Sequence, residues 1–92
     1  MLRLVSARQY GVTPGWSLVH IGSEGDAVDI NGLDPWTAGD WGRSTGSITV
    51  AHPSYPAQRH TMCTYRVLGP SGPVEFAAGE FSNGVWGLYV PR

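Results

Sequence analysis

The fold is decided by residues 63–78, which read CTYRVLGPSGPVEFAA. On both sides of the Gly/Pro-rich centre, alternate positions are apolar or aromatic: Cys63, Tyr65, Val67, Val74, Phe76 and Ala78. An alternation of period two is typical of a strand with one buried face. Glycine and proline between two such runs favour a tight reversal of the chain. The stretch therefore predicts a hairpin of two antiparallel strands.

Similar alternation predicts further strands outside this hairpin. They are Leu2–Ser6, Trp16–Ile21, Ser47–Ala51 and Val85–Val90. Asn-Gly pairs at 31–32 and 83–84 tolerate the positive φ that tight hairpin turns require. Residues 59–90 therefore indicate a three-stranded antiparallel meander, whereas Asp34–Gly46, which is rich in Gly, Asp and Trp, indicates a long loop.

Glycine and proline leave little room for a helix anywhere in the chain. The longest run without either residue, Ala57–Leu68, has the length of only one average helix. We therefore predict an all-β fold, a small antiparallel barrel or sandwich of five to seven short strands with little helix, formed by a single domain over residues 1–92. The rival prediction is an α+β fold with one short helix around residues 56–66.

Charge composition excludes one class of partner. The chain has no lysine, and its six arginines are scattered and offset by seven carboxylates, which gives a net charge of −1. Binding to a phosphate backbone needs a concentrated basic face, so no nucleic-acid partner is expected. The use of arginine without lysine indicates a GC-rich, bacterial genome.

Hydropathy and cysteine content bear on the compartment. No stretch approaches the ~20 apolar residues of a membrane span, so no membrane partner is expected. Residues Met1–Arg8 carry charges inside their apolar run, unlike a signal peptide. Cys63 is the only cysteine, which excludes an intrachain disulfide and favours a cytoplasmic location.

Metal-ligating residue types occur without the spacing of a metal site. His60 and Cys63 are three residues apart, but side chains at that spacing on a strand point to opposite faces. Structural zinc sites usually offer paired cysteines, and Asp26–Asp34 lacks the ligand order of a calcium loop. We therefore expect no metal and no cofactor and assign no catalytic residue. The alternative is a small enzyme or a metal-assisted site around His52, His60 and Cys63.

The stretch His52–His60, which reads HPSYPAQRH, is the candidate ligand site. Its two prolines stiffen the chain, and its polar and aromatic side chains can form hydrogen bonds or stack. Together with Trp86, the side chains of His52, Tyr55, Arg59 and His60 predict a site for a small polar ligand or a protein partner. The alternative is a plain connection between strands, with prolines that block edge pairing.

Two tryptophans in the long loop allow three interpretations. Trp36 and Trp41 lie beside Asp34 and Asp40, and such pairs of a ring and a carboxylate can bind the face and hydroxyls of a sugar. The same rings can form an interface with a partner chain, where Trp is enriched. They can also cover one end of the barrel. The interface interpretation is the one that assigns Trp36 and Trp41 to a site.

We expect a non-catalytic binding or interaction module that associates with itself. No catalytic constellation or cofactor motif occurs, the domain is small and four tryptophans need shelter. The last predicted strand ends at Val90, two residues before the end of the sequence, so we expect an open sheet edge there. A small chain gains stability when such an edge is buried in a homodimer. Carbohydrate binding through Trp36 and Trp41 is a further alternative.

Overall fold

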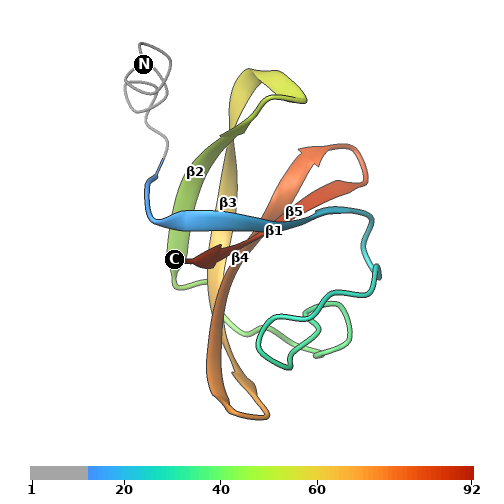
Figure 1. Cartoon of the computed structure of the whole chain (residues 1–92), viewed down its shortest axis with the longest axis vertical. Coiled ribbons are helices and arrows are strands. Elements are labelled where there is room, and N and C mark those ends of the chain that lie inside the picture. The colour runs from blue at the N-terminus through green and yellow to red at the C-terminus, as the bar shows by residue number, and fades with distance from the viewer. Residues whose placement is uncertain (1–12) are drawn as a thin grey trace.

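The computed structural model describes residues 13–92, apart from the side chains of residues 56–58. Its strands are β1 (Trp16–Gly22), β2 (Gly46–His52), β3 (Tyr55–Gly69), β4 (Gly72–Ser82) and β5 (Val85–Pro91). They form one antiparallel sheet in the order β1-β5-β4-β3-β2, which curls into a half-barrel (Figure 1). The described residues contain no helix. The all-β prediction is therefore confirmed.

Both predicted hairpins of the C-terminal meander are present. Gly69 pairs with Gly72 across the first turn, and Ser82 pairs with Val85 across the second. In the second turn Gly84 takes a φ of +78°, which glycine adopts without the steric penalty of a Cβ. Both connections are short, because the residues within each turn allow the chain to reverse direction locally.

One helix prediction is wrong. The rival helix around residues 56–66 is absent, because β3 runs as one strand of 15 residues through that region. Its alternating side chains Met62 and Thr64 are buried on one face, where a helix would scatter them around its axis. The predicted strand Leu2–Ser6 lies outside the described residues.

The expected open edge at the last strand is also wrong. β5 lies inside the sheet, between β1 and β4. The sheet edges are instead β1 and β2, and each contains a register shift, between Leu18 and His20 in β1 and between Val50 and His52 in β2. Such irregularities disrupt the regular backbone edge that another strand would need for pairing.

The concave face of the sheet holds one of two apolar clusters. Its buried members are Ile48, Val50, Met62, Ala77, Phe81 and Tyr89, and Trp16, Ile21 and Tyr55 pack against them. These residues come from all five strands. A flat sheet would hold its edge strands roughly 19 Å apart, four spacings of about 4.8 Å. The shared cluster therefore requires the sheet to curl.

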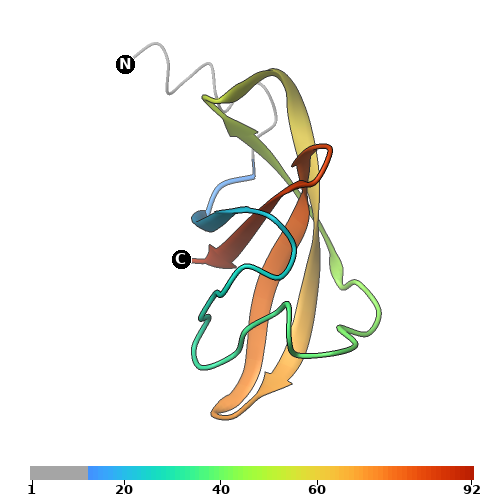
Figure 2. The ribbon, with the colours of Figure 1, turned by 90° about the vertical axis from the view of Figure 1, so that its right-hand side faces the viewer.

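The other cluster forms where the loop of residues 23–45 packs on the convex face. The loop contributes Ile30 and Leu33, and the sheet contributes Val74, Phe76 and Leu88. Figures 1 and 2 show this loop beside the long β3–β4 hairpin, which extends past the other strands. The loop thus covers the apolar face of a hairpin that would otherwise be open to solvent on that side.

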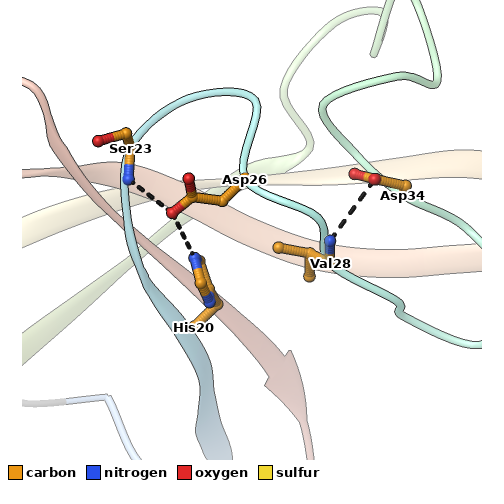
Figure 3. Close-up of polar contacts among 5 residues, drawn as sticks. All are labelled: His20, Ser23, Asp26, Val28 and Asp34. Carbon is orange, nitrogen blue, oxygen red and sulfur yellow. Dashed lines mark hydrogen bonds and ion pairs between the residues drawn. The ribbon is translucent and has the colours of Figure 1, made fainter.

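Aspartates hold the loop in shape through turns. Asp26 Oδ2 accepts hydrogen bonds from the Ser23 backbone N–H and from His20 Nε2, both at 2.9 Å (Figure 3). Asp34 Oδ1 accepts from the backbone N–H of Trp36 at 3.0 Å. Aspartate favours such turns because its short side chain reaches backbone N–H groups nearby. These hydrogen bonds join Asp26 to the end of β1 and Asp34 to the backbone of the loop.

Candidate binding groove

A groove lies between the loop and the sheet. It has a volume of about 470 Å³ and is lined by Asp29–Asn31 on one side and Pro73–Glu75 on the other, with Val19, Val90 and Pro91 at its end. A second hollow of about 340 Å³ adjoins it and shares Asn31, Pro73 and Val74 with it. Because they share these residues, the two hollows join into one depression that runs along the start of β4 toward the β3–β4 turn.

The groove exists because β4 is longer than the strand beside it. The β4 ladder to β3 covers Gly72–Ala78, whereas its ladder to β5 begins only at Ala77. The first residues of β4 therefore have a strand on one side only. On their other side lies the loop segment around Asn31.

A tight turn shapes the loop wall. Asn31 and Gly32 both take positive φ, +52° and +85°, as predicted for the Asn-Gly pair. Ile30 and Leu33 exchange backbone hydrogen bonds of 2.8 and 3.0 Å across the turn. The Gly32 N–H also donates to Asp29 Oδ1 at 2.8 Å. This turn connects no strands, so here the prediction was correct for the turn and wrong for a hairpin.

The lining combines apolar side chains with polar groups in nearly equal measure, and the polar groups include two carboxylates and the Asn31 amide. Val19 is 40% exposed, although valine is usually buried. The carboxylates of Asp29 and Glu75 are exposed at opposite walls. None of the described residues that line the groove is a histidine, cysteine or lysine. The groove therefore provides apolar contacts and negatively charged carboxylates.

Three of the predicted ligand-site residues lie together, but on the concave face of the sheet and not in the groove. Tyr55 stacks on Phe81 with a ring-centroid distance of 5.0 Å and an interplanar angle of 9°. His52 and His60 pack against the same Phe81 ring, at 5.6 and 5.0 Å. His60 is only 7% exposed, and its Nε2 lies 3.3 Å from the Tyr55 carbonyl oxygen. These rings form part of the concave-face packing.

The remaining predicted site residues lie at other positions on the sheet. Arg59 is exposed on β3. Trp86 packs on the convex face with the loop, where its ring meets Trp36 edge-on at 5.5 Å. Cys63 is half-buried beside Tyr65, and burial together with this thiol raises the pKa of the Tyr65 hydroxyl. His60 and Cys63 project to opposite faces of β3, so the structure does not bring the two histidines and the cysteine together.

The loop tryptophans are engaged within the chain. Trp36 lies against Trp41 at 5.6 Å, and Trp41 meets Phe76 edge-on at 5.1 Å. Trp41 Nε1 donates to the Pro35 carbonyl at 2.8 Å. The indole N–H groups of Trp36 and Trp86 are buried, and no group among the described residues accepts a hydrogen bond from either. This packing matches the interpretation in which the rings cover part of the sheet, and an interface or sugar site at Trp36 and Trp41 stays a prediction.

The groove residues were missed by the sequence analysis, with one partial signal. The Asn31-Gly32 pair indicated a turn, but nothing local indicated that it would approach residues 73–75. In the structure a Cβ on Gly32 would lie 3.7 Å from the Pro70 ring, which shows how close the two turns are. Contacts between segments some 40 residues apart in the chain have no signature in local residue patterns.

Comparisons with known proteins give no relative for this chain. No family model matches, and neither the curated proteins nor the solved structures contain a significant match. Within residues 13–92 no three His, Cys, Asp or Glu side chains gather as a metal site would need. The same residues include no helix with the length and apolarity to span a membrane.

Proposed function

We propose that this protein is a non-catalytic binding module and that the groove between the loop and β4 is its binding site. The observation that carries the proposal is a preformed hollow of about 470 Å³, within the usual size range of about 300–1,000 Å³ for ligand sites. Its lining combines polar and apolar surface in nearly equal measure, so polar groups can orient a ligand while apolar groups pack against it. The lining offers no nucleophile paired with a base, which favours binding over catalysis.

A matched pair of substitutions tests the groove. Val19 and Leu18 are neighbours on β1 and are both 40% exposed, but only Val19 lines the groove. The probes are small amines, polyols and carboxylates together with blocked pentapeptides of acidic, neutral and basic composition. We expect at least one probe to shift the amide NMR signals of residues 29–31, Val74 and Glu75. Val19→Tyr should abolish these shifts by filling the groove, and Leu18→Tyr should preserve them. Shifts that survive Val19→Tyr, or that map only elsewhere, contradict the proposal.

Self-association is a second proposal, supported by the exposed side chains of the outer strand. Leu18 leaves 40% of its surface in solvent and lies outside the groove, so a second copy can cover it without closing the groove. Because β1 has a register shift, we propose contact through side chains and not through a continued sheet. Sedimentation equilibrium at tens of micromolar should give twice the chain mass, and Leu18→Arg should give the monomer. A monomeric parent protein at that concentration rejects this proposal.

We propose a cytoplasmic location for the chain. Support comes from Cys63, the single cysteine, which forms no disulfide. Fractionation of cells that express the full chain should place it with cytoplasmic markers, and its recovery from an oxidising compartment would count against this.

A further inference from the structure

The ligand class of the groove follows from its hydrogen-bonding groups, and this inference rests on the proposed function. The Glu75 carboxylate forms no hydrogen bond or ion pair with any described residue. The Asp29 carboxylate uses Oδ1 to accept from Gly32, and no contact within residues 13–92 occupies Oδ2. Both side chains are exposed, so each keeps acceptor capacity at the wall of the groove.

The backbone at the floor of the groove is also short of donors. In an antiparallel ladder, alternate residues direct their N–H and C=O groups toward the same neighbouring strand. Ala77 of β4 pairs with Tyr89 of β5. Two residues further in the same register, Glu75 would lie opposite Pro91. Proline has no N–H, so Pro91 cannot donate to the Glu75 carbonyl. Pro73, which lies two residues before Glu75 in β4, likewise has a carbonyl but no N–H.

Carboxylates outnumber cationic residues in the loop wall of the groove. The loop of residues 23–45 contains five of the seven carboxylates of the chain, and Arg43 is its only arginine. On the strand wall, Glu75 lies opposite Arg66 in the β3–β4 ladder. An anionic ligand would therefore meet repulsion and few donors. A cation would meet carboxylates and carbonyls, and charged donors make the stronger hydrogen bonds.

We propose that the groove binds an extended polypeptide segment of a partner protein through an arginine or lysine side chain. The apolar stem of such a side chain packs along Val19, Val90 and Pro91, while its charged end lies between Asp29 and Glu75. The elongated shape supports a polypeptide occupant, because the adjoining hollow of about 340 Å³ leads on toward Ser71 at the hairpin turn. A single small amine would leave that second hollow unused.

The test compares blocked pentapeptides in NMR titrations of the full chain. The probe is acetyl-Ala-Val-Arg-Val-Ala-amide, and two controls replace its arginine by citrulline, which is neutral and similar in shape, or by glutamate. We expect the arginine peptide to shift the amides of residues 29–31, Val74 and Glu75 and to bind at least about tenfold tighter than the citrulline peptide. Its affinity should fall as NaCl is raised, because salt screens exposed charges.

Variants locate the charge that matters. Asp29→Asn keeps an oxygen for the Gly32 N–H, and Glu75→Gln keeps the shape of the side chain. Each should weaken binding of the arginine peptide at least about threefold, and the double variant should remove its advantage over citrulline. Glu24→Gln removes the same charge from an exposed loop position outside the groove and should leave binding unchanged.

The outcomes separate this inference from the proposed function. If citrulline and arginine peptides bind the groove equally, the cationic class is overturned while the groove remains a binding site. If a simple alkylguanidine binds as tightly as the arginine peptide, a polypeptide occupant is overturned. If no peptide shifts the amide signals of residues 29–31, Val74 or Glu75, but another probe of the wider panel does, only this inference fails.

Discussion

The backbone N–H of Thr13 donates to the backbone carbonyl of Thr49 at 2.8 Å, and the Thr49 N–H donates to Thr13 Oγ1 at 3.0 Å. Thr49 lies in β2, whereas Thr13 lies three residues before β1, so this reciprocal pair joins the two edges of the sheet. The half-barrel is therefore closed at this point by two hydrogen bonds in place of a strand ladder. Both backbone groups of Thr49 that face outward from the sheet are satisfied there.

Removal of the Thr13 hydroxyl should weaken this closure. Thr13→Val keeps the shape of the side chain but leaves the Thr49 N–H without its acceptor, which we expect to lower the free energy of unfolding by about 1 kcal/mol. Urea unfolding followed by tryptophan fluorescence measures the change. Thr13→Ser restores the hydroxyl and should recover most of the loss. Equal stability of Thr13→Val and the parent protein would show that the hydrogen bond contributes nothing.

Truncation of the buried Phe76 side chain should lower stability far more than truncation of the exposed Leu68 side chain near the end of β3. Phe76 is fully buried at 0% exposure, whereas Leu68 is 78% exposed. We expect Phe76→Ala to cost about 3–5 kcal/mol through lost burial and the cavity it leaves, and Leu68→Ala to change stability by less than about 0.5 kcal/mol. Thermal and urea unfolding of both variants provide the measurement. Similar losses for the two would contradict the assignment of Phe76 to the core.

Local residue patterns were enough to predict most strands and turns. The alternation around Tyr65 and Phe76 and the breakers between them define β3, β4 and their turn, because these signals act over a few residues. The pairing of β1 with β5 joins residues such as Trp16 and Pro91. That pairing depends on how the whole sheet curls. Because of it, β5 lies inside the sheet, whereas the sequence had indicated that the last strand would be an edge.

The candidate site was less predictable than the fold. The stretch His52–His60 is rich in groups that bind ligands, yet His60 and Tyr55 are used to pack against Phe81. A buried ring and a ligand-binding ring have the same residue type, so composition cannot separate them. The groove instead arises from a difference in strand length and from the proline at position 91, features that matter only once the register is known.

Acid should remove the contribution of the Asp26 carboxylate. The hydrogen bonds from His20 and from the Ser23 N–H hold the pKa of Asp26 below its ordinary value of 3.8, against a smaller opposing effect of desolvation. A carboxyl group whose pKa is lowered by folding contributes stability that is fully present above 3.8 and is lost as the pH falls through the lowered value. We therefore expect Asp26→Asn to be less stable than the parent protein at about pH 5 and to approach it at about pH 2.

Urea unfolding at the two pH values measures this difference, and Glu24→Gln serves as the control for loss of one loop charge. NMR titration of the Asp26 carboxyl carbon should give a midpoint below 3.8. A stability gap that stays constant over the acid range would contradict a role for the charged carboxylate.

The absence of a side chain at Gly79 is required by the close approach of β3. A Cβ on Gly79 would lie 2.6 Å from Met62 Sδ and 2.7 Å from the Thr61 carbonyl oxygen. The methionine end can move, but the carbonyl belongs to the backbone of the neighbouring strand and cannot move without disturbing the sheet. We expect Gly79→Ala to lower the free energy of unfolding by about 1–3 kcal/mol, although alanine is the better residue for an ordinary strand.

Two comparisons identify the cause of that loss. Ser82→Ala, at an exposed position of the same strand, should leave stability nearly unchanged in urea unfolding. The double variant Gly79→Ala/Met62→Leu removes the sulfur but keeps the Thr61 carbonyl, so it should remain less stable than Met62→Leu alone. If Met62→Leu fully rescues Gly79→Ala, the side chain of Met62 and not the strand backbone is the source of the crowding.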